Sequence, residues 1–198
     1  MATALSIASA VLILVTGVMY FLQVRRGQSH PNAATWIIWL FVDTLNLASY
    51  SEMVREEPFK AFAALAATIN AFVIFAYAAM HRHFAKIDRV DVALLLLTAM
   101  IAVIWKATGN ATLSNVLLQG VFVISFALTI RSVWNGANEH PAAWLVAVAA
   151  YLLSIIAIVI SWDSANDGWQ LAFPIINGVL GNGSVPVTLW IVQRRRRA

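Results

Sequence analysis

Seven apolar segments, each bounded by charged residues, proline or glycine, follow one another along the chain with only short connections between them. A helix needs roughly 20 mostly apolar residues to cross the hydrocarbon core of a bilayer. The segments approach that length and leave no room for a separate soluble domain. We therefore predict an all-α integral membrane protein with seven transmembrane helices, at residues 4–24, 33–50, 62–80, 90–105, 112–130, 142–160 and 169–192.

The composition points the same way. The chain of 198 residues is 61% hydrophobic and 11% charged, whereas about a quarter of the residues in a soluble domain are charged. Cysteine is absent, which excludes disulfides, thiolate metal sites and cysteine nucleophiles. No basic region precedes the first apolar segment, so we expect a retained first helix rather than a cleaved signal peptide.

The 13 lysines and arginines favour one orientation. With the N-terminus outside, ten fall on the cytoplasmic side and three outside, which matches the positive-inside rule for an N-out/C-in protein. The four arginines at 194–197 then serve as an anchor to anionic lipid rather than a nucleic-acid patch. We expect lipid and no nucleic acid as partners, and a multi-pass location in the cell membrane, specifically a bacterial inner membrane. The cytoplasmic set is Arg25, Arg26, Arg82, Lys86, Arg89, Arg131 and residues 194–197.

The first three segments and the last three carry similar features in the same order. The matches are 20–25 with 126–131, His30-Pro31 with His140-Pro141, Trp36 with Trp144, and Asn70 with Asn177. Internal repeats of this kind are common in secondary transporters. We predict two parallel three-helix repeats, at 1–83 and 110–198, joined by a linker helix within 84–109, a 3+1+3 arrangement.

This arrangement resembles the SWEET / PQ-loop superfamily of small solute carriers. Residues 22–29 look like a degenerate PQ-loop motif, although Leu22 and Leu128 stand where the motif has proline and Thr129 replaces the second glutamine. The resemblance implies alternating-access transport, with Asn70 and Asn177 as a pair of pocket asparagines. It also makes proton coupling plausible, because amino-acid exporters of this superfamily use it.

Asp43 lies near the middle of the second segment, where an unpaired carboxylate is costly. At about 100° per residue, it shares one helix face with Trp36, Trp39, Asn46 and Tyr50. We expect this face to point into the bundle. Asp43 then either binds a substrate or a proton, or serves as a structural partner of a polar residue on another helix.

Polar residues in the middle of other segments are predicted to converge with Asp43 at the bilayer midplane, where carriers bind their substrates. The predicted substrate-binding residues are Asp43, Asn70, Gln119, Tyr151, Asn177, Trp36, Trp39 and Asn46, with Asp43 also the proton-coupling group. Two plainer interpretations stay open. In one, the amides are interhelical hydrogen-bonding groups. In the other, the tryptophans of the second and sixth segments form an interfacial belt. Pro174, Gly178 and Gly181 predict a kinked or closely packed seventh helix.

We therefore expect a transporter of a small polar solute (a sugar, an amino acid or an amine), either a facilitator or a proton-coupled carrier. The alternative is a non-transporting subunit or an assembly or sensory partner in a larger membrane complex, and homo-oligomers are also compatible with the sequence. An enzyme is not expected, because no second acid lies at mid-span beside Asp43. No cofactor or metal is predicted either, since the close-set His81 and His83 lie in a connection.

Overall fold

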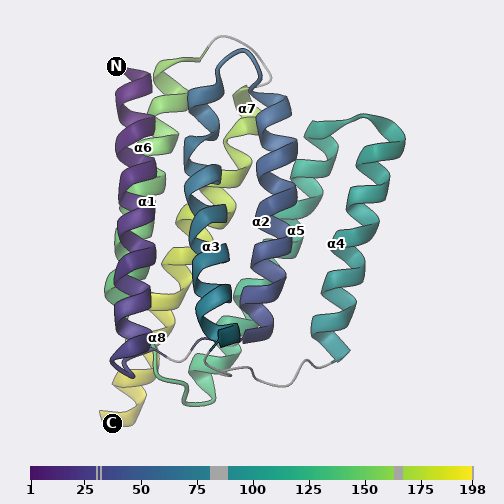
Figure 1. The fold of residues 1–198 in the computed structure, drawn as a ribbon. Helices are drawn as coiled ribbons and strands as arrows, with labels where there is room; N and C mark the ends of the chain where they lie inside the picture. The colour runs from purple at the N-terminus through teal and green to yellow at the C-terminus, as the bar shows by residue number, and fades with distance from the viewer. Residues whose placement is uncertain (30, 32, 81–88, 163–166, 198) are drawn as a thin grey trace.

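The computed structural model describes residues 1–29, 31, 33–80, 89–162 and 167–197. All regular elements in these ranges are helices, which run side by side in one bundle with the chain ends at opposite ends (Figure 1). They are α1 (Ala2–Arg25), α2 (Ala33–Met53), η1 (Pro58–Ala61), α3 (Phe62–Met80), α4 (Arg89–Thr108), α5 (Ala111–Trp134), α6 (Pro141–Ile160), α7 (Asp167–Gln170), η2 (Phe173–Gly181) and α8 (Asn182–Arg197). His81, Arg82, His83 and Lys86 lie outside the described residues.

Five helical segments are long and apolar enough to cross a membrane. They are α1, Pro58–Tyr77, α5, α6 and the segment Asp167–Arg196, which joins α7, η2 and α8. The chain is therefore a multi-pass α-helical membrane protein. The predicted segments match the helices closely: the largest difference at any end is five residues, from 192 to Arg197.

The outer surface of the bundle is apolar, as a bilayer requires, and the interior combines an apolar core with buried polar residues. Val18 of α1, Phe72 of α3 and Val103 of α4 are each at least 60% exposed. Ser9 and Ser125, by contrast, are fully buried in the interior. The polar residues are thus collected between the helices, where they can meet one another or a solute.

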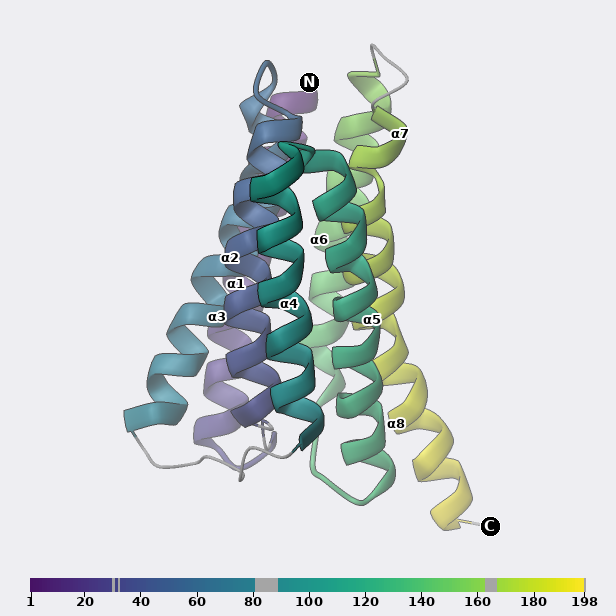
Figure 2. The ribbon, with the colours of Figure 1, turned by 90° about the vertical axis from the view of Figure 1, so that its right-hand side faces the viewer.

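The packing of the helices follows a regular order. α1 and α2 both pack against α3, while α5 and α6 both pack against η2 and α8. These two groups meet where α1 contacts α6 and where α2 contacts α5. α4 lies at the periphery, against α5 and α2 (Figures 1 and 2). The interface between the two groups is therefore formed by the long helices other than α4.

The last span contains a wide turn at the level of the bundle centre. Residues Phe173–Gly181 form a π-helix, in which the backbone N–H of Asn182 donates to the carbonyl of Asn177. Such segments are uncommon and occur frequently at functional sites. Gly178 lies directly against the ring of Tyr151, and Gly181 against the ring of Phe126, so a methyl group at either glycine would overlap that ring. The close packing predicted for this helix is confirmed.

Candidate functional site

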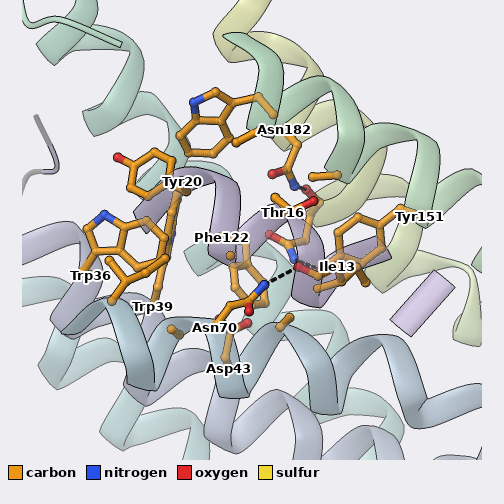
Figure 3. Close-up of a pocket in the computed structure, with 18 of the residues that line it drawn as sticks. Ile13, Thr16, Tyr20, Trp36, Trp39, Asp43, Asn70, Phe122, Tyr151 and Asn182 are labelled. Atoms are coloured by element: carbon orange, nitrogen blue, oxygen red, sulfur yellow. Dashed lines mark hydrogen bonds between the residues drawn. The ribbon is translucent and has the colours of Figure 1, made fainter. Parts of the chain in front are cut away.

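A pocket lies in the middle of the bundle, between the two groups of helices (Figure 3). We call it the central pocket. Every long helix except α4 contributes to its wall. Six of the eight residues predicted to bind substrate line it, namely Asp43, Asn70, Tyr151, Asn177, Trp36 and Trp39. The helical periodicity of α2 thus placed its polar face correctly: Trp36, Trp39, Asp43, Asn46 and Tyr50 are all buried.

Among the residues that the structure describes, Asp43 is the only charged one in the wall of the pocket. Its side chain is only 7% exposed. The Oδ1 atom is buried and has no hydrogen-bond partner among the described residues. A buried carboxylate without such a partner is unfavourable in an apolar interior. Asp43 is therefore held in the pocket by the rest of the fold rather than by a partner of its own.

Asn70 and Asn177 each form a hydrogen bond with a neighbouring helix. The Nδ2 group of Asn70 donates to the carbonyl of Ile13 on α1 (dashed line in Figure 3). This bond requires Gly17, because a side chain there would overlap the Asn70 amide. On the other side, Asn177 Nδ2 lies 3.4 Å from the hydroxyl of Tyr151. Both amides therefore combine hydrogen bonding between helices with a place in the pocket wall.

The tryptophans of α2 and α6 are not an interfacial belt. Trp36, Trp39 and Trp144 are 8%, 7% and 5% exposed, and they pack on one another and on Tyr20 at ring-centroid distances between 4.9 and 6.0 Å. The belt interpretation is wrong because the periodicity of both helices turns these rings inward. We call these four residues the aromatic cluster.

Asn46 and Gln119, also predicted to bind substrate, lie elsewhere. They belong to a buried group of polar side chains that joins α2 to α5. Asn46 Oδ1 accepts hydrogen bonds from Asn115 Nδ2 at 2.9 Å and from Gln119 Nε2 at 3.2 Å, and Asn115 Nδ2 also donates to Ser49 Oγ at 3.3 Å. These residues do not line the central pocket. Their position is that of interhelical hydrogen-bonding groups.

At the lower end of Figure 1, polar contacts connect α1 and the loop after it with the loop before α6. We call them the lower contacts. Tyr20 OH donates to Glu139 Oε1 at 2.9 Å, and Trp144 Nε1 donates to Glu139 Oε2 at 3.3 Å. Beside them, Gln23 Nε2 lies 3.2 Å from His140 Nδ1, and the backbone N–H of His140 donates to Ser29 Oγ. The aromatic cluster separates these contacts from the pocket, since its four residues line both the central pocket and a smaller cavity at Glu139.

At the opposite end, a second set of polar contacts joins the same two groups of helices. We call them the upper contacts. Lys60 Nζ lies 2.9 Å from Asp167 Oδ1, and both residues are 2% exposed. Glu57 also pairs with Lys60, and Tyr50 OH donates to the carbonyl of Gln170 at 2.9 Å. Phe173 packs between Tyr50 and the pocket residue Tyr151.

Neither set of contacts between the helix groups was predicted from the sequence, and no role was assigned to Lys60, Asp167 or Glu139. Lys60 and Asp167 looked like ordinary loop charges, and they are 107 residues apart. Tyr20 did leave a signal: it continues a stripe at helical spacing on α1 whose other members, apart from Ile13, are small or polar. That stripe, Ser6, Ser9, Ile13, Gly17, Tyr20 and Gln23, is buried along its whole length.

The central pocket has a volume of about 80 Å³. A buried water needs roughly 10–15 Å³ on this scale, so the pocket has room for several waters or for a solute of a few heavy atoms. A sugar ring would require it to widen. No family model matches the chain, and neither the curated proteins nor the solved structures contain a match to it.

The upper contacts generate a prediction about stability. Replacing Lys60 by methionine leaves Asp167 and Glu57 next to a buried apolar side chain, and removing one partner of a buried pair destabilises by about 3–5 kcal/mol. We expect a markedly lower melting temperature for Lys60→Met in detergent. The double variant Lys60→Met/Asp167→Leu should lose less than Lys60→Met alone, because no buried carboxylate then remains at position 167. A double variant that is less stable than the single one would contradict a paired role.

The lower contacts generate a prediction about pH. Burial raises the pKa of Glu139 above its ordinary value of 4.5, although hydrogen bonds from Tyr20, Trp144 and Ser29 act in the opposite direction. A carboxyl whose pKa is raised by folding favours the folded state below its unfolded pKa, and this contribution is lost as the pH rises through the folded pKa.

We therefore expect the melting temperature of the wild type to fall more steeply than that of Glu139→Gln between pH 4.5 and neutrality. The glutamine keeps an acceptor for Tyr20 but cannot ionise. Thermal melts of both proteins across this range provide the measurement. Parallel curves would show that Glu139 makes no such contribution.

Proposed function

We propose that the chain carries a small polar solute across the membrane by alternating access around the central pocket. The observation that supports this most directly is the position of the pocket. It lies between two groups of helices that contact each other separately at either end, through the lower contacts and the upper contacts. Opening one set while the other stays closed would expose the pocket to one side of the membrane at a time.

The repeat predicted from the sequence fits this mechanism, and we propose repeats at 1–83 and 110–198 with α4 between them. The packing order supports it: the first helix of each half meets the second helix of the other, as a twofold relation between halves requires. The helix ends support it too. α1 and α5 are each followed, two residues after their last helical residue, by a glycine with positive φ: Gly27 at 68° and Gly136 at 96°.

The hydrogen bonds around these two glycines also correspond. Gln28 N–H donates to Gln23 O, and Ala137 N–H to Ser132 O, the six-residue closure of a Schellman cap. The two capping glycines, Gly27 and Gly136, are 109 residues apart. The sequence match between the halves pairs Arg25 with Arg131, which are 106 residues apart. We therefore propose a fold and mechanism like those of the SWEET / PQ-loop superfamily. The helix ends then pair the two halves three residues away from the pairing given by the sequence match.

Asp43 is the residue on which we expect transport to depend. Its carboxylate could bind a positively charged solute, or it could take up and release a proton that drives a neutral one. Asn70, Tyr151 and Asn177 would orient the solute by hydrogen bonds, and Trp36 and Trp39 would supply an apolar wall. In this proposal the amides of Asn46 and Gln119 hold α2 to α5 during the cycle.

The orientation can be tested with a fusion. We propose that the N-terminus lies outside and the C-terminus in the cytoplasm, in a bacterial inner membrane if the source is bacterial. A green fluorescent protein fused after the four arginines at 194–197 should then fluoresce in bacterial cells, because it folds in the cytoplasm. An alkaline phosphatase fused at the same place should be inactive. The opposite pair of results would reverse the topology.

Transport is tested by uptake into proteoliposomes that contain the purified chain. Sugars, amino acids and amines are offered with and without a proton gradient, to the wild type, Asp43→Asn and Thr44→Val. Thr44 is adjacent but exposed on the outer face of α2, so its variant should behave like the wild type. Asp43→Asn should reduce uptake to the level of empty liposomes. If folded wild-type protein takes up no solute, the chain is better explained as a non-transporting subunit of a membrane complex.

A further inference from the structure

The electrostatic character of the central pocket is one-sided. Among its lining residues Asp43 carries the only formal charge, and no lysine, arginine or histidine is present to balance it. Asp43 is more than nine-tenths buried, and its Oδ1 has no partner. A bound anion would face this carboxylate without a cation of its own. A bound cation would supply the missing partner through charge-assisted hydrogen bonds.

The amide groups of the pocket point to the same class of ligand. Asn70 Nδ2 donates to the carbonyl of Ile13, and Asn182 Nδ2 donates to the carbonyl of Asn177 at 2.8 Å. A backbone carbonyl can only accept, so these bonds fix the orientation of both amides. Each bond uses one of the two N–H groups of the amide, so one donor remains beside the two lone pairs of each Oδ1. The N–H of Trp39 is one further donor without a partner, while the Asp43 carboxylate adds acceptors only. The pocket therefore offers more acceptors than donors, which suits a solute rich in N–H groups.

The rest of the wall is largely aromatic. Seven of its residues carry aromatic rings: Tyr20, Trp36, Trp39, Phe122, Phe126, Trp144 and Tyr151. In Figure 3, Tyr20, Trp36 and Trp39 lie to one side of Asn70 and Asp43, and Tyr151 to the other. Aromatic faces attract organic cations, and indole does so best. Guanidinium groups in addition stack on such rings and bind carboxylates through two parallel hydrogen bonds.

From these three observations we infer that the solute of the central pocket is a small organic cation, an ammonium or guanidinium compound that carries no anionic group. The inference rests on the proposed function, because it specifies what the proposed carrier transports. The pocket volume of about 80 Å³ limits the solute to a few heavy atoms in this arrangement of the helices. A zwitterionic amino acid would place its carboxylate among acceptors, and a sugar would leave Asp43 unpaired.

Guanidinium and urea form a matched pair of probes, since they have nearly the same planar shape and differ in charge. Binding of each to the purified full-length chain is measured by titration calorimetry in detergent. We expect guanidinium chloride to bind and urea to bind at least about tenfold more weakly, because only the cation forms charge-assisted hydrogen bonds. Sodium acetate serves as the anionic control and should not bind.

Variants at Asp43 test which group recognises the charge. Asp43→Asn should weaken guanidinium binding at least about tenfold and leave urea binding unchanged. Asp43→Glu keeps the charge and should retain part of the affinity, and Thr44→Val should match the wild type. Melting curves check that each variant is folded. If Asp43→Asn does not fold, two results still test the inference: the preference of the wild type for guanidinium over urea, and the guanidinium affinity that Asp43→Glu retains.

The outcomes separate this inference from the proposed function. Guanidinium that binds in an Asp43-dependent manner but is not taken up by proteoliposomes would support the cation site and overturn the carrier. Uptake of a sugar or a zwitterionic amino acid without guanidinium binding would support the carrier and overturn the cation site. Equal binding of guanidinium and urea, unchanged binding in Asp43→Asn, or no binding of any probe would each overturn the inference.

Discussion

A carboxylate in the middle of a membrane-spanning bundle must face protein or water rather than lipid, and this bundle is arranged around Asp43. The constraint fixes the rotation of α2, because turning Asp43 inward turns Trp36, Trp39 and Asn46 inward as well. The exposed side of α2 then presents Phe41 to lipid. Once α2 is fixed, its two neighbours follow: α3 supplies Asn70 to the pocket, and α5 supplies Asn115 to the buried amides outside it.

Close approach between helices is the second condition for the pocket. Gly17 brings α1 against the Asn70 amide, and Gly178 brings the π-helical segment against Tyr151. Small residues allow such contacts in membranes, where helix association depends on packing and hydrogen bonds rather than on the hydrophobic effect. The pocket is therefore bounded by backbone and rings that have little freedom to move. A solute can widen it only by shifting whole helices, which favours motion of the two helix groups as units.

The sequence allowed the spans and the inward face of α2 to be predicted because both follow from local periodicity. Gln119 was placed by its depth in the middle of its segment, but depth does not say which neighbour the side chain meets, and Gln119 meets Asn46 rather than the pocket. Trp36 could be interpreted as part of an interfacial belt or as part of the pocket wall. Its position in the segment gives its depth in the membrane, and depth alone does not say whether the ring faces lipid or the bundle interior. Lys60 and Asp167 could not be paired from the sequence, since only the packing of distant helices brings them together.

The polar contacts at the two ends of the bundle differ in their chemistry, and this difference has a mechanical consequence. The upper contacts include a buried ion pair between Lys60 and Asp167, so separating them requires both charges to find water or other partners. In the lower contacts, the donors to Glu139 are the neutral side chains of Tyr20 and Trp144. No cation among these donors holds the carboxylate in its charged form. Burial raises the pKa of Glu139, so protonation of this carboxyl would change the lower contacts. If the helix groups move as units, the lower end has a group through which its opening can respond to a proton gradient.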